Sequence, residues 1–88
     1  MANFMGGSAW AMARDITEGF IMVTERTFMR MLPAELDQLA FEMDRYMRDI
    51  RGEQPALDDL AAIQQRNRKI LRLNTALMML RSYRQKRR

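Results

Sequence analysis

The sequence predicts an all-α domain, a three-helix bundle in which an antiparallel hairpin packs against a longer C-terminal helix. Two observations predict this fold class. Apolar residues recur at helical spacing in three successive segments, a pattern typical of amphipathic helices. Pro33 and the link at residues 52–55 separate these segments, because proline and glycine end helices.

A chain of 88 residues forms one domain, and its core is marginal unless a second chain adds apolar surface. We therefore expect a homodimer, either intertwined or side by side. Residues 1–7 are expected to be a flexible leader. Residues 8–88 form the helical domain, which ends in a basic arm at residues 81–88.

The first helix is expected over residues 8–32. Ser8 follows two glycines and is a suitable N-cap. Asp15 offers an alternative start, because Glu18 stands three residues after it in the spacing of a capping box. The apolar stripe continues on the N-terminal side of Asp15, so the start at Ser8 is favoured.

Pro33 ends the first helix and begins the second, since its ring blocks a continuing helix but suits the first helical position. So short a connection indicates an antiparallel hairpin. The second helix, residues 33–51, carries its apolar residues in one narrow arc. Phe41 is the exception: it projects from the charged side, as an isolated exposed aromatic or as part of a contact surface.

The third helix is expected from Pro55 to about Tyr83, with Asp58 and Asp59 in its positive first turn. At 1.5 Å per residue it would be about 43 Å long, against about 28 Å for the second helix. It therefore extends beyond its neighbours.

The apolar face of the third helix is wide and has two asparagines near its centre. Asn67 and Asn74 are seven residues apart, so they share one heptad line, where a buried polar residue can fix register between associating helices. The alternative is a partly wet seam between two contacts. We predict self-association through this helix, using Leu60, Ile63, Asn67, Ile70, Leu71, Asn74, Leu77 and Met78.

Charge is divided sharply along the chain. Residues 1–65 hold eleven acids and six bases, a net −5, whereas residues 66–88 hold nine bases and no acid, a net +9, which together give the +4 of the chain. The basic residues can contact nucleic acid phosphates, with Tyr83 available to stack on a base. They can also dock on an acidic protein surface, or form a solvated helix end.

We favour the nucleic acid backbone contact, with an acidic protein partner as the alternative. In the first case the chain is a binding or regulatory module, and in the second an adaptor or assembly subunit. The candidate binding residues are Arg68, Lys69, Arg72, Arg81, Tyr83, Arg84, Lys86, Arg87 and Arg88.

The missing residue types exclude several kinds of chemistry. Without cysteine or histidine, the chain cannot build the common zinc sites or a Ser-His or Cys-His nucleophile. The regularly spaced carboxylates of the second helix lie on its polar side and fit a solvated face better than a metal site. We therefore expect a protein that is not an enzyme and binds neither cofactor nor metal.

No apolar run is long enough to span a membrane, and the N-terminus lacks the pattern of a secretion signal. We therefore expect a cytoplasmic protein. A membrane-surface helix fits less well, because the charges lie beyond the apolar part of the third helix. A helix-turn-helix motif also fits less well, because the link at residues 52–55 and the long third helix suit a bundle.

Overall fold

The computed structural model describes residues 4 and 7–86. Within this part the chain forms four helices, and no strand occurs. They are α1 (Ala9–Glu18), α2 (Glu25–Met29), α3 (Pro33–Gly52) and α4 (Leu60–Lys86). The predicted all-α class is confirmed, with four helices in place of three because the first predicted helix is interrupted.

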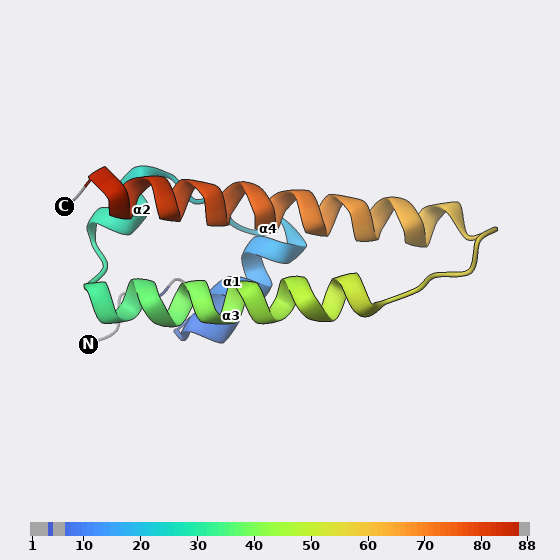
Figure 1. Cartoon of the computed structure of the whole chain (residues 1–88), viewed down its shortest axis with the longest axis horizontal. Helices are drawn as coiled ribbons and strands as arrows, with labels where there is room; N and C mark the ends of the chain where they lie inside the picture. The colour runs from blue at the N-terminus through green and yellow to red at the C-terminus, as the bar shows by residue number, and fades with distance from the viewer. Residues whose placement is uncertain (1–3, 5–6, 87–88) are drawn as a thin grey trace.

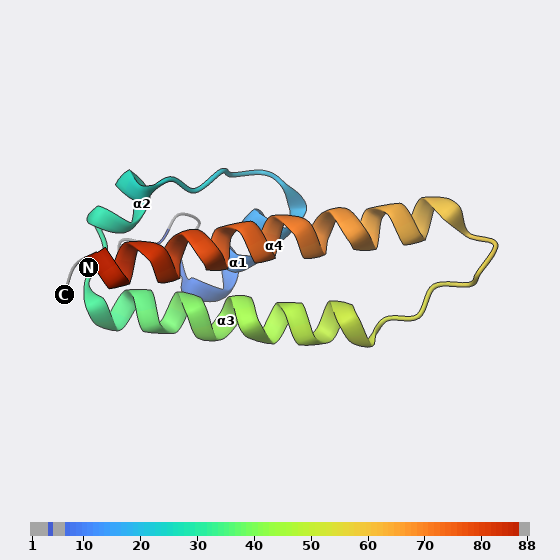
Figure 2. The same cartoon turned by 45° about the horizontal axis from the view of Figure 1, so that its top comes forward.

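The molecule is built on a hairpin of α3 and α4, which run antiparallel and are joined by residues 53–59 (Figure 1). A second view shows α1 lying across this hairpin and α2 beside the C-terminal end of α4 (Figure 2). The predicted hairpin between the first two helices is wrong. The chain turns away at Gly19 and forms α2 before α3 begins, so α1 and α3 contact each other but are not consecutive arms of a hairpin.

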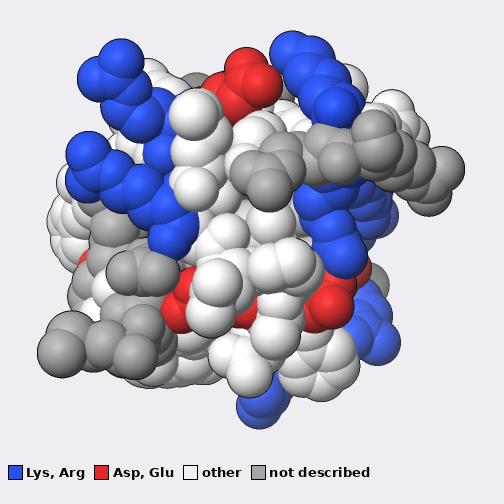
Figure 3. All heavy atoms as spheres, turned by 90° about the vertical axis from the view of Figure 1, so that its left-hand side faces the viewer, with Lys and Arg blue, Asp and Glu red and all other residues white. Residues whose placement is uncertain are grey.

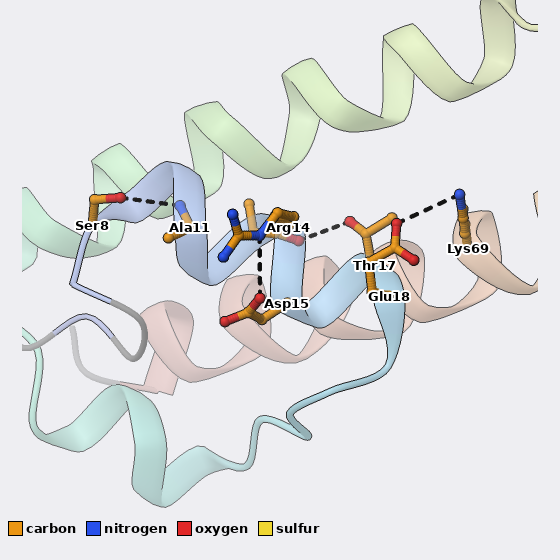
Figure 4. A network of polar contacts seen from close by, with 8 residues as sticks. Ser8, Ala11, Arg14, Asp15, Thr17, Glu18 and Lys69 are labelled. Atoms are coloured by element: carbon orange, nitrogen blue, oxygen red, sulfur yellow. Dashed lines mark hydrogen bonds and ion pairs between the residues drawn. The ribbon is translucent and has the colours of Figure 1, made fainter.

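The N-terminus of α1 lies where the sequence predicts it. The Ser8 hydroxyl oxygen accepts a hydrogen bond from the Ala11 N–H at 3.1 Å (Figure 4), as an N-cap does. The alternative start at Asp15 is wrong, because Asp15 lies inside α1.

Gly19 ends α1 and breaks the helix predicted over residues 8–32. Its φ is 80°, in the left-handed region that costs a residue with a Cβ about 1–2 kcal/mol. The Gly19 N–H donates to the Ile16 carbonyl at 3.2 Å, and the Phe20 N–H donates to the Asp15 carbonyl at 2.9 Å. This is the Schellman pattern, which satisfies the last carbonyls of a helix and turns the chain away from it.

Residues 20–24 then lead into α2, a helix of five residues. The Thr24 N–H donates to the Thr27 hydroxyl at 3.1 Å. So short a helix is not stable alone. It is held by Phe28, which is fully buried and packs against Tyr83 of α4 with ring centroids 6.0 Å apart.

α3 confirms the second predicted helix to within one residue at its C-terminus. Pro33 is its first residue, and the Glu35 carboxylate accepts a hydrogen bond from the Leu32 N–H at 2.8 Å. One face of the helix is apolar and buried, as its spacing predicts. The buried apolar residues are Leu36, Leu39, Met43, Met47 and Ile50.

α4 begins and ends later than predicted. The Asp59 carboxylate accepts a hydrogen bond from the Ala62 N–H at 3.1 Å, so Asp59 precedes the helix as its cap. Pro55 and Asp58 therefore lie in the connection, not in the first turn.

Arg66 fastens the two long helices at the far end of the hairpin. Its guanidinium donates to the carbonyls of Ile50, Arg51 and Glu53 at 3.1 to 3.2 Å. These carbonyls lie at the C-terminal end of α3, where a helix has no backbone donors left to satisfy them.

The core lies where α1, α2, α3 and α4 converge, and it contains most of the large buried side chains. Phe4 packs against it from the N-terminal side, so this part of the predicted leader contacts the domain. The rest of that prediction, for residues 1–3 and 5–6, falls outside the described residues. The fully buried large side chains are Met12, Thr17, Phe28, Leu39, Met43, Leu73 and Leu80.

Candidate functional site

The two halves of α4 differ in how far the chain covers them. The C-terminal half belongs to the core and buries Leu73, Ala76, Leu77, Leu80 and Tyr83. Between residues 60 and 72 no side chain is buried, although several of them are large and apolar. The N-terminal half therefore presents apolar surface that the described part of the chain leaves uncovered.

On the side of α4 that faces away from the core, apolar and amide side chains form one line. Leu60, Leu71 and Met78 are 67%, 65% and 60% exposed. We call this line the outer stripe, and it consists of Leu60, Gln64, Asn67, Leu71, Asn74 and Met78. Successive members are alternately four and three residues apart, which is a heptad pattern.

The outer stripe contains five of the eight residues predicted for self-association. Asn67 and Asn74 are both exposed in the single chain. Ile63 and Ile70 are half-buried beside the stripe. Leu77 is only 3% exposed, so its predicted contact with a second chain is wrong. α1 and α3 pack against this side of α4, and Leu77 is part of the core of its own chain.

A groove of about 420 Å³ lies beside the outer stripe, between residues 19–23 and α4. Leu71 belongs to both the groove and the stripe. Phe20 and Met22, which follow the break at Gly19, are 74% and 88% exposed. The apolar spacing predicts both residues inside a continuous helix and does not reveal them as surface. Gly19 is the signal in the sequence that could have revealed them.

Two of the predicted binding residues, Lys69 and Arg72, hold α1 against α4. The Arg72 guanidinium donates to the Thr17 carbonyl at 3.1 Å, at the C-terminal end of α1, where cations are favoured. Lys69 lies 3.5 Å from the Glu18 carboxylate (Figure 4). Both cations were predicted to contact a partner, and both have partners within their own chain.

Residues 81–86 are the last turns of α4 and lie against the acidic body of the same chain. Three ion pairs hold them there. Each joins exposed groups and contributes about 0–1 kcal/mol. The predictions for Arg87 and Arg88 lie outside the described residues. The pairs are Arg81 with Asp44 at 3.6 Å, Arg84 with Asp37, and Lys86 with Glu25 at 3.6 Å.

The prediction that Tyr83 stacks on a base is wrong. It is 5% exposed and packs against Phe28, so its ring is not available to stack on a base. Tyr83 lies on the side of α4 that faces the core. Its neighbours in sequence are mostly charged, so they gave no sign that its ring is buried.

α2 and its C-cap add two cations to the end of the molecule where α4 finishes. Arg26 and Arg30 are exposed and form no ion pair with a described residue. Figure 3 shows this end, where Lys and Arg side chains lie around the visible face with acidic side chains between them. Arg68, also predicted to bind, is exposed further along α4.

The remaining predicted contact, Phe41, is 59% exposed on α3. It borders a shallow hollow that also includes Ala9 and Gln38. Phe41 therefore belongs to a different helix from the outer stripe.

The acidic side chains do not gather into a metal site among the described residues.

Burial raises the pKa of the Tyr46 phenol above its ordinary value, and nearby Arg14 opposes this rise. The Tyr46 ring packs against Trp10, with centroids 6.2 Å apart.

None of the described helices is long and apolar enough to cross a membrane.

The chain matches no known protein-family model. No curated protein and no solved structure is similar to it either.

Proposed function

We propose that the chain is a non-enzymatic protein-assembly module that self-associates through the outer stripe of α4. The observation that carries this proposal is the uncovered half of α4, where residues 60–72 contain no buried side chain. A helix with apolar residues on two opposite sides needs two neighbours, one for each side.

The residues of the outer stripe favour a helix pair with one preferred alignment and a modest binding free energy. Burying a Leu or Met side chain contributes about 1.5–3 kcal/mol, and three such residues are exposed in each copy. The three amides between them lower the gain, but they favour one alignment of two helices, as a buried asparagine does in a coiled coil. We therefore expect a dimer that forms at micromolar protein concentration.

The proposal predicts that the double variant Leu71→Gln with Met78→Gln raises the dissociation constant of the dimer at least about tenfold. The variant loses two apolar contacts in each copy, and a tenfold change requires a loss of only about 1.4 kcal/mol of binding free energy. Sedimentation equilibrium measures the dissociation constant of the dimer. The matched control is Met29→Gln, an exposed methionine of α2, which should leave the constant unchanged. A pure protein that stays monomeric at micromolar concentrations, or a double variant that dimerises like the parent, would reject the proposal.

A second candidate function is contact with nucleic acid phosphates at the end shown in Figure 3. The favouring observation is that α2, which contains Arg26 and is followed by its C-cap Arg30, contacts α4 near the end that carries Arg84 and Lys86. We rank it second because described cations of α4 already pair with carboxylates of their own chain, and a ligand must displace these.

This second function predicts that Arg26→Gln with Arg30→Gln weakens binding to a labelled DNA duplex several-fold. The slope of log affinity against log salt should fall by about one to two, because each lost phosphate contact removes about 0.9 from it. The control, Arg45→Gln with Arg48→Gln, makes the same charge change on α3. Equal weakening by both pairs would indicate unspecific attraction, and no binding at low salt would exclude this function.

A further inference from the structure

We propose that the helix covering the outer stripe is α4 of a second copy of this chain, lying antiparallel to the first. This inference rests on the self-association proposed above and specifies its geometry.

The charges at the two ends of α4 favour the antiparallel direction. Asp58 and Asp59 lie at the end of the connection before α4 and are exposed. From residue 61 to residue 86 the chain contains no acid, and the last turns carry Arg81 and Arg84, whose present partners are surface carboxylates. A parallel pair would place acids beside acids and bases beside bases, whereas an antiparallel pair places each acidic end beside a basic end.

The order of residues along the outer stripe fits one antiparallel register. When residue 69 of each copy lies at the centre, Leu60 faces Met78 of the second copy and Gln64 faces Asn74 of the second copy. These two pairings join an apolar side chain to an apolar one and an amide to an amide. In the third pairing, close to the two-fold axis, Leu71 faces Asn67 of the second copy.

The amides are available for this arrangement. In the single chain, the Asn74 amide has one hydrogen bond, to the Met78 sulfur at 3.8 Å, and sulfur is a weak acceptor. Asn67 forms no hydrogen bond with a described residue. In the proposed register the two Asn67 side chains lie about one helical turn apart across the axis, where the two amides can approach each other.

The same register brings the charged ends together. Asp58 of one copy lies within about one turn of Arg81 of the other. Two such contacts form, one at each end of the paired helices. One antiparallel alignment is therefore compatible with the stripe, and the charges at the ends of α4 are what favour it over a parallel one.

Disulfide trapping tests the direction directly, because the chain contains no cysteine. A Leu60→Cys chain is mixed with a Met78→Cys chain, exchanged in reducing buffer, and oxidised in a glutathione redox buffer. In the antiparallel register the two different cysteines face each other. Identical cysteines are 18 residues apart along the helix axis, about 27 Å, whereas a disulfide needs Cα atoms within about 7 Å.

We expect mass spectrometry to find the mixed disulfide, which joins the Leu60→Cys chain to the Met78→Cys chain, in at least tenfold excess over both symmetric ones. Symmetric disulfides in excess, from proteins that sediment as dimers, would overturn the antiparallel direction but leave the proposed self-association intact. Monomers in sedimentation, with no disulfide-linked dimer of any kind, would overturn both.

A charge variant provides a second readout that does not alter the stripe. Asp58→Lys places a lysine beside the basic end of the second copy in the antiparallel dimer, and should weaken dimerisation several-fold. In a parallel dimer position 58 lies beside position 58 of the second copy, so the variant replaces an Asp–Asp contact by a Lys–Lys contact and the dissociation constant stays the same. An unchanged dissociation constant would therefore contradict the antiparallel direction. The control is Asp49→Lys on α3, an exposed acid outside the stripe.

Discussion

Replacing Phe28 by Ala is expected to lower the free energy of unfolding by about 3–5 kcal/mol, the cost of removing a large buried aromatic side chain. Phe28 is fully buried and anchors α2 in the core. Its loss leaves a cavity beside Tyr83 and removes the contact that holds a five-residue helix. Domains of this size have only about 5–15 kcal/mol of stability, so this is a large share.

Urea denaturation followed by circular dichroism measures this change, at one fixed protein concentration because association also stabilises the folded state. The matched control is Met29→Ala, the next residue, whose side chain is 62% exposed. It should change the free energy of unfolding by no more than about 0.5 kcal/mol. A loss below about 1 kcal/mol for Phe28→Ala, far under the usual cost of such a truncation, would show that α2 is held by something other than this ring.

Gly19→Ala is expected to lower the free energy of unfolding by about 1–3 kcal/mol, from backbone strain and a lost contact together. The left-handed φ of 80° alone costs a residue with a Cβ about 1–2 kcal/mol. A Cβ at this position would also lie 2.8 Å from the Arg72 guanidinium carbon. Arg72 must then move, and its hydrogen bond to the Thr17 carbonyl is weakened. The same urea experiment measures the effect.

Gly52→Ala serves as the control for backbone chemistry, because Gly52 lies in α3 with no positive φ, and a Cβ added there would have no other atom within 4 Å. It should be neutral or stabilising by up to about 1 kcal/mol. Equal effects of the two substitutions would contradict the role assigned to Gly19. Adding Arg72→Met to Gly19→Ala should cost less than the sum of the single effects, because both act on one contact.

The parts of the fold that were predicted from sequence are those fixed by local chemistry. Ser8 caps α1 because its hydroxyl reaches a first-turn N–H of the same helix. Pro33 begins α3 because its ring suits the first helical position and excludes others. α3 has one narrow apolar arc, so it can turn only one side towards a core.

The break at Gly19 was not predicted, because a glycine inside a helix costs only about 1 kcal/mol and the apolar spacing continues past it. The choice between a continuing helix and a Schellman end is made by contacts distant in sequence. Arg72 binds the last turn of α1, and Phe28, which follows the turn, is buried against Tyr83 of α4.

The candidate interaction site shows the same division. Three features of α4 depend only on the order and spacing of its residues: its wide apolar face, the heptad line shared by its amides, and the bases at its end. The tertiary structure decided which side of α4 is buried, so that Leu77 and Tyr83 enter the core while Leu71 and Met78 stay outside. It also decided which carboxylates meet the basic residues. The physical reason is that a helix of 27 residues with apolar side chains around much of its circumference has no preferred orientation until α1 and α3 pack against one side of it.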